Sequence, residues 1–82
     1  MDRNVIKSQL MNVFDNTGWV DMEKAANEES RLDDDLGFDS LDKIEVCMQI
    51  ERDFGIAIHD DEMDRIKTVG DVLNLLDEII NE

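Results

Sequence analysis

A serine that could carry a covalent modification stands directly behind a glycine-containing turn, in the segment DLGFDSLD at residues 35–42. Aspartate is a favoured helix N-cap, so Asp39 predicts that Ser40 lies in the first turn of a helix with its hydroxyl exposed. The first N–H groups of a helix lack internal partners and favour an anion by roughly 0.3 to 1 kcal/mol. A phosphodiester bonded to Ser40 would therefore suit this position.

Two carboxylates flank this serine and oppose such an anion. Asp39 and Asp42 would each cost on the order of 0.6 kcal/mol at about 7 Å in water, which roughly cancels the contribution of the helix. Docking of a basic modifying enzyme would give these carboxylates a purpose. The alternative is that Ser40 is an ordinary helix cap. These residues alone leave the two interpretations evenly balanced.

The helix predicted from Ser40 to Phe54, with Gly55 at its end, carries two apolar arcs where a simple amphipathic helix has one. We assign the first arc to the core: Val46, Cys47, Ile50 and Phe54. We assign the second arc and its acidic flanks to an exposed recognition strip: Leu41, Ile44, Met48, Glu45 and Glu51. The alternative is that the helix lies deep and both arcs are core.

Other elements must position this helix. A helix from about Asp2 or Asn4 to Asp15 would bury one face and end at residues 16–18. A long connection to Asp39 follows, and its apolar residues are frequent enough to tie it onto the bundle. The expected apolar contacts are Ile6, Leu10, Val13 and Phe14 in the helix and Trp19, Met22, Leu32, Leu36 and Phe38 in the connection.

The last third of the chain predicts two more helices. Asp60 should cap a short one that has Met63 and Ile66 as its apolar contacts. Thr68 and Asp71 have the spacing of a capping box that opens the final helix. Its core residues would be Val69, Val72, Leu73, Leu76, Ile79 and Ile80. The sequence thus predicts one all-α domain over residues 1–82, a small antiparallel bundle of three long helices plus one short helix.

Composition indicates the class of partner. Asp and Glu number 22 against 8 Lys and Arg, and the resulting net charge of −14 repels nucleic acid and anionic lipid. We therefore expect basic protein partners, no nucleic acid, and a fold that salt or magnesium stabilises. Cys47 is the only cysteine and no long apolar run is present. Both features indicate a reducing, cytoplasmic compartment and no membrane span.

The residues around Ser40 resemble the attachment motif of acyl carrier proteins, in which Asp-Ser-Leu follows Leu-Gly-x. The resemblance runs from about Leu32 to Leu76 and is weak before it. It includes Phe54, Ile58, Asp60, Ile66, Thr68 and Val69. In that family the serine takes 4′-phosphopantetheine from coenzyme A, which implies that Ser40 is the attachment residue. The adjoining cofactor-binding positions would be Asp39, Leu41 and Asp42.

The same resemblance implies a monomeric carrier that is not an enzyme, without catalytic residues or a metal. It would hold acyl intermediates as thioesters on the arm and deliver them to enzymes of fatty acid synthesis. Its partners would be a phosphopantetheinyl transferase and basic-surfaced acyl-transfer or condensing enzymes, docking on the recognition strip. Reversing Glu45 or Glu51 to lysine should then slow transfer and leave the fold intact.

The resemblance also implies a pocket for the acyl chain between the second and third helices. Its lining residues would be Val46, Ile50, Ile58, Met63 and Ile66. Methionine and branched aliphatic side chains make an adaptable apolar interior. The equally supported alternative is that these residues are simply core.

Several other functions compete with this prediction. A specialised carrier for polyketide or other secondary acyl transfer would share the motif, and an unmodified acidic helical adaptor would share the strip. The acidic runs at 33–35 and 60–64 suggest calcium binding, but EF-hand spacing fails around both Gly18 and Gly37. A hydrolase would need a base beside Ser40, and His59 is the only histidine. His59 also replaces the proline usual in the family, and residues 19–31 are atypical.

Overall fold

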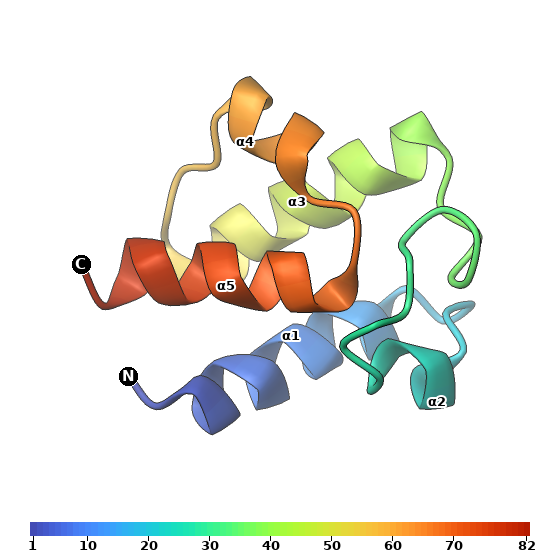
Figure 1. The fold of residues 1–82 in the computed structure, drawn as a ribbon, viewed down its shortest axis with the longest axis horizontal. Helices are drawn as coiled ribbons and strands as arrows, with labels where there is room; N and C mark the ends of the chain where they lie inside the picture. The colour runs from blue at the N-terminus through green and yellow to red at the C-terminus, as the bar shows by residue number, and fades with distance from the viewer.

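The computed structural model describes all 82 residues and contains five helices. They are α1 (Arg3–Asn16), α2 (Met22–Ala25), α3 (Ser40–Phe54), α4 (Asp60–Arg65) and α5 (Val69–Ile80). Helix α1 packs against α3 and α5 and runs opposite to both of them (Figure 1). The only β pairing is an isolated bridge between Arg31 and Thr68. The predicted all-α fold with three long helices is confirmed.

The expectation of a single short helix is wrong, because the long connection contains a second one, α2. The Asp21 side chain caps it by accepting hydrogen bonds from the N–H groups of Glu23 and Lys24 at 3.0 and 3.4 Å. Ala25 at its end is fully buried. Four residues are too few to show a helical repeat of apolar positions, so periodicity could not predict this element.

The predicted boundaries of the long helices agree with the structure, and one predicted cap does not. Asp39 caps α3, and Gly55 ends it with a φ of 66°, in the left-handed region that glycine adopts without strain. For α4 the N-cap is His59, and Asp60 is the first helical residue. The Glu62 carboxylate accepts the His59 N–H at 3.1 Å, so the acidic first turn supplies the cap from within the helix.

Each of the three long helices contributes buried side chains from one face to the core. Eighteen buried apolar residues form a single cluster, and α1 contributes Ile6, Leu10, Val13 and Phe14, as predicted. From the long connection, Leu32, Leu36 and Phe38 are buried as expected, whereas Met22 is half-buried and Trp19 is 50% exposed. Most of the predicted apolar contacts therefore tie the connection onto the bundle, and Trp19 stands partly outside it.

Backbone pairing holds the long connection against the start of α5. The N–H of Leu32 donates to the Lys67 carbonyl at 2.9 Å, and the N–H of Val69 donates to the Ser30 carbonyl at 3.0 Å. Gly70 lies so close that a Cβ there would be 3.0 Å from the Glu28 carbonyl oxygen. A larger residue at position 70 would force the Glu28 carbonyl to move by a few tenths of an ångström. The connection is thus fixed at its middle, and it delivers the chain to the start of α3 in a defined position.

Candidate functional site

Ser40 is the first residue of α3, and its side chain is exposed. The cap of this helix is Asp39, whose carboxylate accepts the Asp42 N–H at 2.7 Å. The Ser40 hydroxyl makes no hydrogen bond within the protein, so it does not cap the helix. Of the two interpretations that the sequence left balanced, the structure supports a free and accessible hydroxyl.

The carboxylates beside Ser40 have a structural purpose of their own. Asp39 and Asp42 form a reciprocal capping box, because the Asp42 carboxylate accepts the Asp39 N–H at 3.1 Å in return. Each satisfies a donor that the helix leaves unpaired. Their presence next to Ser40 therefore does not require a docking role.

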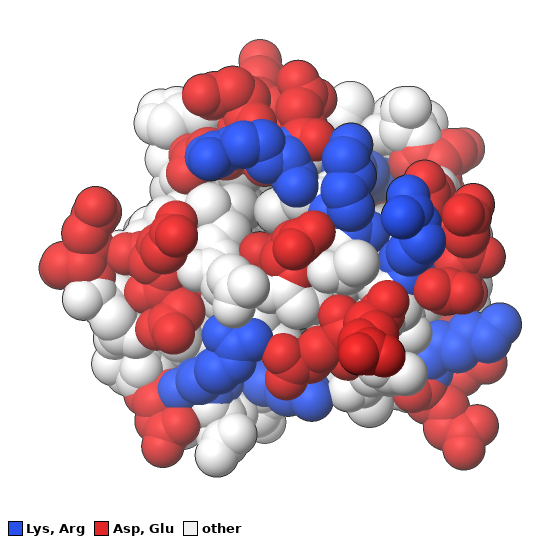
Figure 2. All heavy atoms as spheres, in the orientation of Figure 1, with Lys and Arg blue, Asp and Glu red and all other residues white.

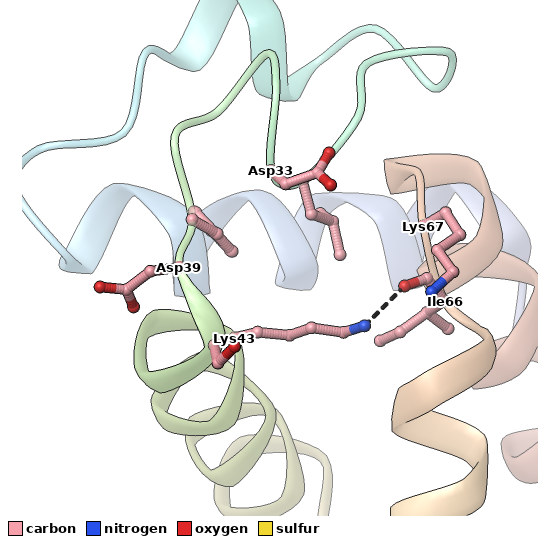
Figure 3. Close-up of a pocket in the computed structure, with 8 residues that line it drawn as sticks. Asp33, Asp39, Lys43, Ile66 and Lys67 are labelled. Atoms are coloured by element: carbon pink, nitrogen blue, oxygen red, sulfur yellow. Dashed lines mark hydrogen bonds between the residues drawn. The ribbon is translucent and has the colours of Figure 1, made fainter.

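Two hollows adjoin Ser40, one on each side of Lys43. The first, of about 180 Å³, opens between the long connection and the residues that join α4 to α5, and Asp33, Ile66 and Lys67 line it. The second, of about 350 Å³, lies between α3 and α4. Figure 3 shows Lys43 reaching across from α3, where its ammonium donates a hydrogen bond to the Ile66 carbonyl at 2.8 Å. The lysine thus bridges α3 to the end of α4.

Sequence reasoning did not single out Lys43. The available signal was its spacing, because a residue three positions after Ser40 lies on the same side of the helix one turn later. The acceptor on Ile66 could not be inferred, since backbone carbonyls carry no side-chain signature.

The apolar part of the recognition strip is exposed, as predicted. Leu41 is 62%, Ile44 46% and Met48 54% exposed, while Val46, Cys47 and Ile50 on the opposite arc are buried. The alternative in which both arcs are core is wrong. Figure 2 shows Asp and Glu side chains at many places on this face of the molecule, with fewer Lys and Arg side chains among them. The strip therefore lies on a strongly acidic body.

The two acidic flanks of the strip differ in their surroundings. Glu45 is exposed and forms no ion pair. Glu51 is half-buried, and its carboxylate accepts the Ile58 N–H at 3.2 Å across the turn that follows α3. Glu51 therefore helps to hold the α3–α4 connection, a task that the helical wheel did not indicate.

The residues expected to line an acyl pocket divide into two groups. Val46, Ile50, Ile58 and Ile66 are buried members of the core cluster. Met63 is half-buried and lines the hollow between α3 and α4 together with Ser40. The structure therefore places Met63 at the same hollow as Ser40 and the other four residues inside the core.

Cys47 and His59 are the remaining side chains that could act as a nucleophile or a base. Cys47 is 2% exposed, and burial raises the pKa of its thiol, with Glu51 adding to the rise and Lys43 opposing it. A buried thiol with a raised pKa is a poor nucleophile. His59 is exposed at the start of α4. None of the five helices has the length and apolar composition that crossing a bilayer demands.

Two comparisons relate this chain to known proteins. The family described as "Phosphopantetheine attachment site" matches residues 19–76, which include α3 and both hollows. The acyl carrier protein of Thermotoga maritima is 36% identical over 76 residues, which cover 93% of each chain. The cofactor is 4′-phosphopantetheine, and the protein is a carrier and not an enzyme. The family model matches most of the chain, the relative covers nearly all of it, and the fold is a small helical bundle with a free serine hydroxyl at a helix start. The chain therefore belongs to the acyl carrier protein family.

Proposed function

We propose that this chain carries acyl groups as thioesters on a 4′-phosphopantetheine arm attached to Ser40 and delivers them to enzymes of fatty acid synthesis. The observation that supports Ser40 is its free hydroxyl at the first position of α3, with the cap supplied by its neighbour Asp39. A hydroxyl that served as the cap would have to leave its amide partner before modification. Ser40 requires no such rearrangement.

The start of α3 suits the phosphodiester of the arm. The N–H groups of Ser40 and Leu41 make no hydrogen bond within the protein, and the helix dipole favours negative charge at this end. The Asp42 N–H is already bound by Asp39, so the capping box leaves the first two amides free. When bound, the arm supplies a terminal thiol that carries the acyl group as a thioester. The protein contributes the tether position, the docking surface and the surroundings of the acyl chain.

The recognition strip is the proposed docking surface for the phosphopantetheinyl transferase and for acyl-transfer and condensing enzymes. Three exposed apolar side chains next to the exposed Glu45 carboxylate fit a partner surface that is apolar at its centre and basic at its rim. Charge attraction of this kind speeds encounter more than it slows dissociation. A carrier that visits several enzymes in turn needs that combination.

The hollow between α3 and α4 is the proposed entrance for a sheltered acyl chain. Ser40 and Met63 both line it, and the core residues Val46, Ile50, Ile58 and Ile66 belong to the adjoining apolar interior. A chain entering there would have to displace packed side chains. Saturated acyl arms of increasing length on the holo protein should therefore perturb Met63 first and the buried residues only with longer chains, which methyl NMR spectra would show.

The attachment is tested by incubating the protein with coenzyme A, magnesium and a phosphopantetheinyl transferase and measuring the intact mass. The wild type and the exposed-serine control Ser8→Ala should gain the mass of the arm, and Ser40→Ala should not. A mass gain in Ser40→Ala would move the attachment elsewhere. An unmodified wild type would favour an adaptor without the arm.

The pathway is tested with the loaded protein. Acyl transfer from the holo form to a condensing enzyme of fatty acid synthesis should be faster than transfer to a polyketide synthase module with the same acyl group. The reverse order would assign the protein to specialised acyl transfer and would leave the attachment to Ser40 intact.

A further inference from the structure

Lys43 carries a positive charge that takes part in no ion pair, in a chain with 22 acidic residues. Its half-buried side chain crosses from α3 to the end of α4, where the ammonium donates a hydrogen bond to the neutral carbonyl of Ile66 at 2.8 Å (Figure 3). An ammonium group has three N–H donors, so two remain without a partner in the protein. Lys43 thus offers a positive charge that is held in place and has unused hydrogen-bonding capacity.

This charge lies next to Ser40. Residues three positions apart on a helix have their Cβ atoms about 5–6 Å apart, and Ser40 and Lys43 together line both hollows that adjoin the serine. Lys67, which is exposed and forms no ion pair, also lines the smaller hollow. Two of the eight basic residues of the chain therefore share this hollow with Ser40.

The carboxylates of the smaller hollow already have partners, which distinguishes them from the two lysines. Asp33 pairs with Arg31 at 3.3 Å. Asp39 accepts the Asp42 N–H at 2.7 Å. The charged groups of this hollow that lack a partner of opposite charge or a capping role are therefore cationic. An anion with hydrogen-bond acceptors fits them, whereas an apolar acyl chain would desolvate both ammonium groups without pairing them.

We propose that Lys43 is a positioning residue that holds the phosphodiester of the arm on Ser40, with Lys67 as a second positive charge in the same hollow. A phosphodiester has a negative charge and oxygens that accept hydrogen bonds, and the free N–H donors of Lys43 match both. The bond to the Ile66 carbonyl need not break, so this anchor ties the base of the arm to α3 and to the end of α4. It also offsets the repulsion from the carboxylates beside Ser40. The inference rests on the proposed attachment to Ser40.

The anchor is tested by measuring how the arm changes the unfolding equilibrium. Urea unfolding of the apo and holo forms gives the ratio of the holo to the apo unfolding constant for the wild type, Lys43→Met and Lys43→Arg. Methionine keeps an unbranched apolar stem without the charge, and the lost bond to Ile66 weakens apo and holo forms alike, so it cancels in the ratio. The ratio should rise about two- to fivefold in Lys43→Met and stay at the wild-type value in Lys43→Arg.

Lys24→Met is the matched control for net charge. Lys24 is an exposed lysine of α2 that forms no ion pair and lines neither hollow, so its replacement should leave the ratio at the wild-type value. Adding Lys67→Met to Lys43→Met should raise the ratio further, and an unaltered ratio would overturn the role of Lys67. An equal ratio in Lys43→Met and the wild type, or an equal rise in Lys24→Met, would overturn the anchor.

A spectroscopic measurement on the wild-type chain does not depend on any variant folding. With isotopically labelled lysine nitrogens, the NMR signal of the Lys43 ammonium should shift when the apo form becomes holo, and that of Lys24 should not. Intact mass separates this inference from the proposed function. A Lys43 signal that is unchanged in fully modified protein would overturn the anchor alone, whereas failure to modify Ser40 would refute the attachment and the anchor together.

Discussion

Replacing Asp39 separates its role as a helix cap from its role as a charge next to Ser40. Asp39→Asn keeps an oxygen that can accept the Asp42 N–H, now bound at 2.7 Å, and removes one negative charge. Asp39→Ala removes both. Asparagine and aspartate are about equal as caps, whereas alanine typically costs about 1 kcal/mol. For a domain of this size, that difference lowers the melting temperature by about 4–8 °C.

Only half of the capping box is at risk in these variants, because the Asp42 carboxylate still accepts the backbone N–H of residue 39. The alanine cost should therefore not exceed the value for a single cap. Thermal and urea unfolding of the apo proteins would measure it, and initial rates of phosphopantetheine transfer would measure the effect of charge. We expect equal rate losses in the two variants and a stability loss in Asp39→Ala alone. A stability loss in Asp39→Asn as large as that in Asp39→Ala would refute the capping assignment.

Three further predictions rest on other hydrogen bonds and on the net charge. Glu45→Lys should slow acyl transfer without changing stability. Glu51→Lys should slow transfer and also lower the unfolding free energy by about 1 kcal/mol, because the hydrogen bond from the Ile58 N–H is lost. Equal urea midpoints for the two variants would contradict this. The Lys67 N–H at 2.9 Å, opposed by partial burial and aided by Thr68, lowers the pKa of Asp71 below 3.8. The ionised Asp71 carboxylate therefore stabilises the fold fully above the pKa that it has in the unfolded chain, and this stabilisation is lost as pH falls through its lower pKa in the folded protein. Plots of unfolding free energy against pH for the wild type and Asp71→Asn should therefore converge in acid. Magnesium or sodium chloride should raise the melting temperature, because the net charge is −14; an unchanged temperature would count against self-repulsion.

The start of α3 could be predicted because its signals are local. An aspartate before the first turn and a glycine after the last one act through the conformations and amides of their immediate neighbours, so Asp39 and Gly55 mark the helix in the sequence as they do in the structure. The two apolar arcs of α3 could also be predicted, since helical spacing assigns residues to faces. Because a small bundle can bury only a limited surface, we expected one arc to be core and the other to stay exposed, as the structure has them.

Other features escaped prediction because neither helical periodicity nor residue type gives a signal for them. Helix α2 is too short to show a repeat, and the cap of α4 lies on His59 because Glu62 reaches back to it. Glu51 was assigned to the surface alone, yet the turn after α3 brings the Ile58 amide to its carboxylate. The chain composition gave no indication that Trp19 would face α3.

The sequence by itself determined the all-α class, the extents of the long helices, the acidic surface and the serine at a helix start, because each depends on residue type and on spacing within a few turns. Tertiary structure alone decided that Lys43 reaches the Ile66 carbonyl and that Trp19 and α3 enclose a hollow. These are contacts between segments far apart in the chain. Their geometry is set by the packing of α1, α3 and the long connection around one core, which no local pattern encodes.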